Sequence, residues 1–188
     1  DYMDNIFVNE NEEFPHKNYY SGRHPIETED LIFIPLQDAD RHYPNTKIMA
    51  SKYEMVGMDF NDWSIYFTFN RNYEKENDLF YNKLGLSDTD EYCLVLRNYG
   101  SPPNSLKFPI NYSGDLKVIE LEFYDGFTLF DWCKVIENSS ELHLIDSSIN
   151  YIIDKLTLVS NDLNLYTRRK NNFSEIDYLF NKKYKYII

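Results

Sequence analysis

The chain of 188 residues is long enough for one α/β domain with a smaller appendage, but short for two complete doubly wound domains. A formal net charge of −12 argues against binding nucleic acid or an anionic membrane through a basic face. Only 6 glycines are present, which disfavours a glycine-rich phosphate loop, whereas 17 Tyr and 13 Phe can build a core and also line a polar groove.

The first 70 residues predict a reduced N-terminal portion. Residues 1–30 are acidic and irregular, and residues 31–36 (LIFIPL) form an apolar run that predicts a strand. Residues 45–56 carry apolar side chains at helical spacing, which predicts a helix. Residues 63–70 (WSIYFTFN) alternate aromatic or aliphatic with smaller or more polar side chains, and this period of two predicts another strand.

The remaining residues, 71–188, predict a second, larger domain. Five short apolar runs are expected to be strands: 92–97, 116–121, 141–145, 163–167 and 184–188. Three segments with helical periodicity are expected to be helices: 70–84, 129–137 and 147–158. Strands that alternate with helices of about ten residues favour right-handed crossovers, and therefore a Rossmann-like, mainly parallel α/β sheet with flanking helices.

The loops after the predicted strands are the best candidates for a ligand site, because open parallel sheets bind ligands beyond the carboxyl ends of their strands. Asp146, Ser147 and Ser148 follow the strand at 141–145 and open a helix. Two hydroxyls and the free N–H groups of a first helical turn can hold a diphosphate. The alternative is simple capping of the helix by Asp146 or Ser147.

A second candidate loop follows the strand at 92–97. Arg97 stands at its carboxyl end and can pair with a phosphate through two parallel hydrogen bonds. Asn98 follows Arg97 and is a candidate for contacting a ribose, a base or a sugar. Gly100 would allow the backbone to approach a ligand closely. An ordinary loop with a surface arginine is the alternative.

Two further groups lie at the same predicted edge. Tyr124 and Asp125 precede Gly126 and are candidates for contacting a ribose or a base, although Asp-Gly is also a common turn pair. Arg168 begins the basic triplet 168–170 after the strand at 163–167, where it can reach an anion or simply form a solvated charge run.

Metal binding and membrane insertion are not expected. Cys93 and Cys133 each lie in an apolar run and predict reduced core thiols. The four histidines show no metal-ligand spacing, and His143 is expected inside a strand. No signal peptide or transmembrane run is apparent, so we expect a cytoplasmic protein without a membrane span.

Two stretches carry a family resemblance. Residues 128–156 (TLFDWCKVIENSSELHLIDSSINYIIDKL) resemble the nucleotide-binding C-terminal half of GT-B-fold glycosyltransferases, and in particular small heptosyltransferase-like proteins of bacteria and phages. In that family a D-[ST]-[SG] turn opens a helix, and Asp146-Ser147-Ser148 matches it here. Residues 69–101 resemble the linker helix and first strand of the same half. Together the resemblance covers about residues 67–169.

The resemblance implies a nucleotide-sugar donor, with its diphosphate near Ser147, and transfer of the sugar to an unknown sugar or glycan acceptor without a metal or cofactor. The family's first domain opens with a strand and a glycine-rich loop, which this chain lacks. Asp38 and Asp40 are the carboxylates we would test as the catalytic base, although Asp38-Ala39-Asp40 also suits the entry to a helix. The alternative is a non-catalytic binding or assembly module of the same fold, or a phage or viral accessory protein.

Overall fold

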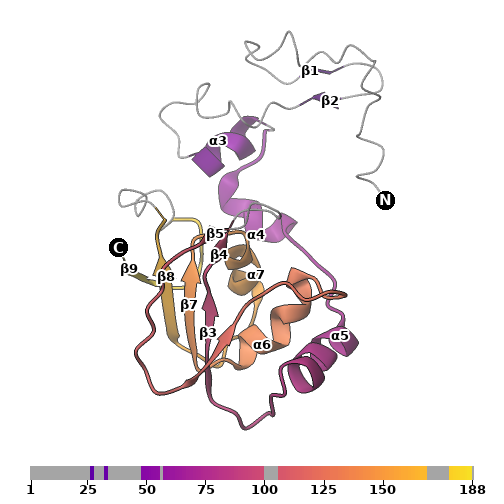
Figure 1. Cartoon of the computed structure of the whole chain (residues 1–188). Coiled ribbons are helices and arrows are strands. Elements are labelled where there is room, and N and C mark those ends of the chain that lie inside the picture. The colour runs from indigo at the N-terminus through magenta and orange to yellow at the C-terminus, as the bar shows by residue number, and fades with distance from the viewer. Residues whose placement is uncertain are drawn as a thin grey trace. The chain divides into compact units, whose positions relative to one another are not determined.

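The computed structural model describes residues 26–27, 32–33, 48–55, 57–99, 106–168 and 178–187 (Figure 1). The chain divides into two compact units, Asp1–Thr68 and Phe69–Ile188. The predictions for Asp38, Asp40 and Gly100 lie outside the described residues. Within the described ranges, no helix combines the length and apolar character that crossing a membrane requires.

The first unit contains a small hairpin and short helices. Strands β1 (Ile26–Glu27) and β2 (Ile32–Phe33) pair antiparallel, and β2 falls within the apolar run at 31–36. Helix α3 (Ile48–Met55) confirms the helix predicted from apolar spacing.

The strand predicted at 63–70 is wrong. The chain forms a 3₁₀ turn, η2 (Phe60–Asp62), followed directly by α4 (Trp63–Tyr66). The Asp59 carboxylate accepts a hydrogen bond from the Asn61 N–H at 2.8 Å and so caps the start of this helical stretch. Ile65 is 68% exposed, so the alternating pattern does not mark one buried face of a strand.

The second unit is built on a sheet of five parallel strands in the order β6-β3-β7-β8-β9. The strands are β3 (Tyr92–Leu96), β6 (Lys117–Glu120), β7 (Glu141–Ile145), β8 (Asp162–Tyr166) and β9 (Lys185–Ile187). This confirms the predicted mainly parallel α/β sheet. The chain runs from β3 to β6 in one direction and then passes β3 to reach β7, so the strand order reverses between β3 and β7.

Helices cover one side of this sheet (Figure 1). They are α5 (Tyr73–Asn77) with its π-helical continuation η3 (Asp78–Lys83), η4 (Leu129–Trp132) with α6 (Cys133–Asn138), and α7 (Ile149–Lys155). The Tyr92 hydroxyl donates to the Val135 carbonyl at 2.6 Å, which places the side chain of Tyr92 on the helical side. Because side chains alternate along a strand, Leu94 and Leu96 face the same way, and all three are buried.

An extended segment runs along the opposite side of the sheet (Figure 1). Within it, β5 (Leu106–Lys107) pairs antiparallel with β4 (Asn98–Tyr99), directly after β3. Ile110 is buried, and the Phe108 and Tyr166 ring centroids are 6.5 Å apart. This segment stands where a doubly wound sheet would have a crossover helix between its first two strands.

The helix termini differ from the predicted ones for local reasons. Asn72 caps α5, since its side-chain oxygen accepts from the Lys75 N–H at 3.1 Å, so this helix begins after the predicted residue 70. Gly85 ends that helical run at φ 62°, a conformation that favours glycine. Helix α7 is shorter than the predicted 147–158, because the backbone is already extended at Leu156.

Candidate functional site

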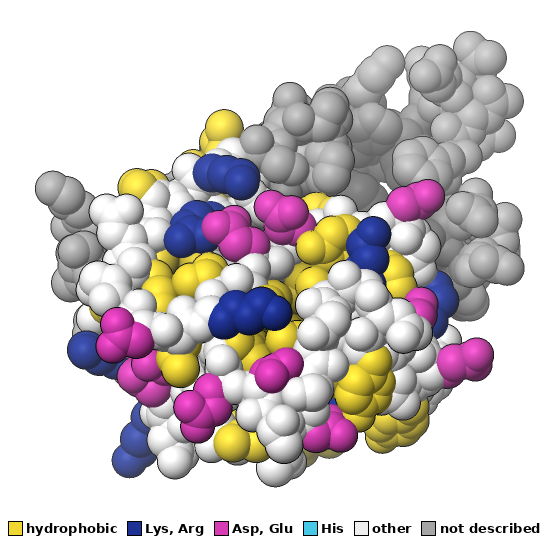
Figure 2. Space-filling view, turned by 60° about the horizontal axis from the view of Figure 1, so that its bottom comes forward, with side chains coloured by type: hydrophobic (Ala, Val, Ile, Leu, Met, Phe, Trp, Pro, Cys, Tyr) yellow, Lys and Arg dark blue, Asp and Glu magenta, His cyan; other side chains and the backbone are white. Residues whose placement is uncertain are grey.

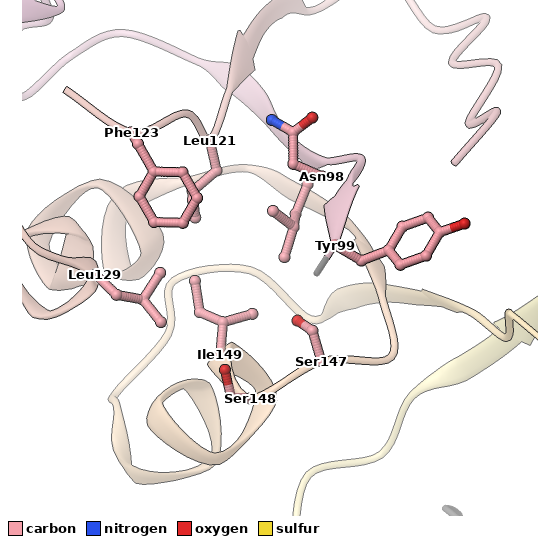
Figure 3. Close-up of a pocket in the computed structure, with 9 residues that line it drawn as sticks. Asn98, Tyr99, Leu121, Phe123, Leu129, Ser147, Ser148 and Ile149 are labelled. Atoms are coloured by element: carbon pink, nitrogen blue, oxygen red, sulfur yellow. The ribbon is translucent and has the colours of Figure 1, made fainter. Parts of the chain in front are cut away.

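A pocket lies at the carboxyl edge of the sheet, beyond the ends of β6, β3 and β7 (Figure 3). The strand order reverses between β3 and β7, and such switch points are where open α/β sheets bind ligands. The space available is about 100 Å³, which accommodates one moiety of a ligand. Its lining consists of Leu96, Asn98, Tyr99, Leu121, Phe123, Leu129, Ser147, Ser148 and Ile149.

The pocket has an apolar wall and a polar wall. Figure 3 shows Phe123 and Leu129 facing Ile149, with the side chains of Asn98 and Ser147 on the other side of the space. Phe123 is 63% exposed, so an aromatic ring stands open to solvent at the rim. An apolar wall with a few convergent polar groups is typical of small-molecule sites.

Ser147 and Ser148 lie on the turn between β7 and α7. The Ser147 hydroxyl oxygen is buried and has no hydrogen-bond partner within the described part of the chain. Ser148 is exposed and makes no capping hydrogen bond through its side chain. Neither Asp146 nor Ser147 caps the helix through its side chain, as the alternative had predicted. Instead, the side-chain oxygen of Asn150, inside the helix, accepts a hydrogen bond from the Ser147 N–H at 2.9 Å.

A cation stands beside this turn. The Arg168 Nε donates to the Asp146 Oδ1 at 2.7 Å, and the Arg168 backbone N–H donates to the same oxygen at 3.2 Å. The guanidinium carbon lies 5.4 Å from the ring centroid of Tyr99, which lines the pocket. The Asp146 side chain is 10% exposed and that of Arg168 is 42% exposed. Asp146 therefore orients a solvent-facing arginine next to the pocket.

Arg97 does not line the pocket. Its Nε and Nη2 donate to the Ile110 carbonyl at 3.1 and 3.0 Å, and its Nη1 pairs with the Glu120 carboxylate. The reason is strand parity: Leu96 faces the helical side, where the pocket is, so the next side chain points to the opposite side.

Tyr124 and Asp125 are also absent from the lining. The Tyr124 ring stacks on Trp132 with centroids 6.0 Å apart, and the Lys83 Nζ lies 4.9 Å from the Tyr124 centroid. Asp125 is exposed at a turn with Gly126, whose φ is 82°. Tyr124 and Asp125 therefore belong to the turn that connects β6 to η4.

A second group of polar side chains lies on the other side of the sheet, around His143 in the middle of β7. His143 contacts the Tyr166 hydroxyl through Nδ1 at 2.8 Å and Glu141 through Nε2 at 3.5 Å. Burial lowers the pKa of His143, although the neighbouring Glu141 acts in the opposite direction. Burial likewise raises the pKa of Cys93 to about 12.

The described surface offers no extended basic area on the face shown in Figure 2. Acidic, basic and apolar side chains are mixed on this face, which comes forward when the bottom of Figure 1 is turned toward the viewer.

Sequence reasoning identified Asn98, Ser147 and Ser148, which all line the pocket, but missed the apolar wall. Phe123 and Leu129 flank the turn at 124–127 and are far apart in sequence from the serines. Phe123 lies three residues beyond the end of β6 and Leu129 is the first residue of η4, and no local sequence pattern marks either as a lining residue.

Comparisons with family models, with curated proteins and with solved structures give no match for this chain.

Proposed function

We propose that the chain is a glycosyltransferase-like protein of GT-B type that binds a nucleotide sugar at the switch-point pocket, and that it transfers the sugar to a sugar or glycan acceptor. The observation that carries this proposal is the convergence of an open aromatic wall, an unpartnered buried serine hydroxyl and an oriented arginine at the carboxyl edge between β3 and β7. The aromatic wall suits the base or the sugar ring, and the serine and the arginine suit the phosphates.

The phosphates are assigned to the polar wall. Ser147 and Ser148 offer hydroxyl donors, and Arg168 offers a guanidinium that can form charge-assisted hydrogen bonds to phosphate oxygens. Helix α7 has only seven residues, so the phosphate contacts are assigned to these side chains and not to a helix dipole. Arg97, which the sequence favoured for this role, is tied to Glu120 and Ile110, and Arg168 takes its place in the proposal.

The apolar wall is assigned to the base or the sugar ring. The Phe123 ring provides a flat surface for stacking, and Asn98 provides both a donor and an acceptor on the other side of the pocket. In the transfer step, the bond between the anomeric carbon and the diphosphate oxygen breaks and a bond to the acceptor oxygen forms. The acceptor hydroxyl loses its proton to a base, for which Asp38 and Asp40 remain the residues to test, and the nucleoside diphosphate is released.

A non-catalytic binding module is the second candidate. It is favoured by the lining itself, because none of its nine residues is an aspartate, glutamate or histidine that could exchange a proton with an acceptor. Both candidate functions use the same nucleotide site, but only the enzyme would transfer the sugar.

The first experiment measures binding to the whole chain. Melting temperatures are recorded with a panel of uridine, guanosine, cytidine and adenosine diphosphates and their sugar conjugates, since a ligand that binds only the folded state raises the melting temperature. The tightest ligand is then titrated by calorimetry. Release of nucleoside diphosphate in the presence of candidate glycans distinguishes the enzyme from the binding module.

Two arginine variants test the placement of the phosphates. Arg168→Ala removes a charge-assisted contact worth about 1.5–3 kcal/mol, so we expect the affinity to fall about ten- to a hundredfold. Arg97→Ala is the matched control: it lowers the melting temperature by removing the contact with Ile110 but leaves the affinity unchanged. Equal affinities for wild type and Arg168→Ala, or no binding by any nucleotide, would contradict the proposal.

A further inference from the structure

The sheet register brings three chemically distinctive side chains together on the side away from the helices. Cys93 on β3 is paired with Glu141 on β7, and His143 stands two residues further along the same strand. Side chains two residues apart in a strand share a face, so Glu141 and His143 project to the same side as Cys93. The Cys93 sulfur, a Glu141 carboxylate oxygen and a His143 ring nitrogen lie within 4.8 Å of one another.

We propose that Cys93, Glu141 and His143 form a binding site for a zinc ion. A thiolate, an imidazole and a carboxylate are the three protein ligand types that Zn²⁺ prefers. With metal–ligand bonds of about 2.0–2.3 Å, tetrahedral ligand atoms are about 3.3–3.6 Å apart. The His143 Nε2 and the Glu141 Oε2 are already separated by 3.5 Å.

The remaining adjustment toward tetrahedral geometry is small. Because no pair of the three ligand atoms is more than 4.8 Å apart, tetrahedral separation requires a movement of at most about 1 Å. The Glu141 side chain is 30% exposed, so it is free to rotate, and the His143 side chain is 12% exposed.

The surroundings of His143 match those of a metal-ligating histidine. Its Nδ1 is hydrogen-bonded to the Tyr166 hydroxyl at 2.8 Å, which orients the ring so that Nε2 faces Glu141. The Asn164 side-chain nitrogen also lies 3.3 Å from Nε2, and the metal ion would displace this contact. Histidine ligands commonly use their second nitrogen for such an orienting hydrogen bond. The Tyr112 ring packs edge-on against His143 with centroids 5.2 Å apart and covers the group.

The site is separate from the pocket of the proposed function. Cys93 and Glu141 lie near the amino ends of their strands, whereas the pocket lies beyond the carboxyl ends. The ion would cross-link two neighbouring strands and hold the covering segment near Tyr112. Its role would therefore be structural, and the result of its test is independent of nucleotide binding.

The test uses the whole chain and Co²⁺ as a spectroscopic probe for Zn²⁺. After treatment with a chelator, titration with Co²⁺ should produce a thiolate-to-cobalt charge-transfer band that saturates at one equivalent and disappears when Zn²⁺ is added. Cys93→Ser should abolish the band, and Cys133→Ser, which replaces an equally buried thiol elsewhere in the core, should leave it intact.

Two milder variants keep the test decisive if Cys93→Ser does not fold. Tyr166→Phe removes the orienting hydroxyl but no ligand, so the Co²⁺ affinity should fall about ten- to a hundredfold. Glu141→Gln should weaken binding at least as much while circular dichroism stays unchanged. Three results would overturn the proposal: no thiolate band, loss of the band in Cys133→Ser alone, or unchanged Co²⁺ affinity in both milder variants. The closeness of His143 and Glu141 would then be explained by a hydrogen bond between them.

Discussion

Replacing Arg71 by Met should destabilise the second unit by leaving a buried carboxylate without its partner. The Arg71 Nε donates to the Glu76 Oε1 at 2.8 Å, and Nη2 pairs with the second oxygen. Glu76 lies on α5 with only 1% of its side chain exposed, while Nη2 also contacts Glu137 on α6 at 2.8 Å. The hydrogen bond with Glu76, more than any other interaction, raises the pKa of Arg71.

The magnitude follows from this burial. Removing one partner of a buried ion pair typically costs about 3–5 kcal/mol, because the remaining charge is left unsolvated. The Arg71 side chain is 18% exposed, so water can replace part of the lost interaction, and we expect a loss near the lower end, about 3 kcal/mol. For a unit of this size that corresponds to a fall in melting temperature of roughly 10 °C.

Urea unfolding followed by circular dichroism measures the free energy of unfolding of the variant. Lys183→Met, which removes an exposed cation, is the control and should change stability by less than about 0.5 kcal/mol. The double variant Arg71→Met with Glu76→Leu removes both charges, so it should be more stable than Arg71→Met alone. A loss below about 1 kcal/mol for Arg71→Met, or no recovery in the double variant, would refute the reasoning.

Three further outcomes are expected. Gly114→Ala should lower the free energy of unfolding by about 1–3 kcal/mol in urea titrations, because the added Cβ would lie 2.2 Å from the Tyr112 hydroxyl. An unchanged free energy of unfolding would show that the Tyr112 side chain moves freely. Cys133, whose pKa burial raises to about 12, should resist alkylation at pH 8 until the protein is unfolded; rapid labelling of the native protein by mass spectrometry would contradict this. Phe123→Ala should weaken nucleotide binding in calorimetry. The melting temperature should change little, because the ring is 63% exposed. A large fall in melting temperature would mean that the ring packs in the core.

The central strands could be predicted from the sequence because burial on both sides of a parallel sheet requires continuous apolar runs. β3 and β7 both begin at the predicted residue, and β7 also ends as predicted. The alternation with helices was enough to predict parallel pairing, since a parallel connection needs a crossover.

Where local patterns compete, the sequence was not sufficient. Residues 63–66 alternate like a strand but form a helical turn, because Asp59 caps the preceding turn and the helical hydrogen bonds are satisfied locally. The sequence after β3 lacks a helical period, and it did not predict that β4 and β5 pair antiparallel.

For the candidate sites, the sequence by itself determined which residues follow each strand, and only the tertiary structure decided which of them meet. Arg97 and Asn98 are neighbours in sequence, yet only Asn98 lines the pocket, because strand parity turns Arg97 to the other side. Cys93 and His143 are fifty residues apart and show no ligand spacing, but the register of β3 on β7 brings them together. Periodicity is a local property that a sequence carries, whereas strand order and register depend on packing between distant segments.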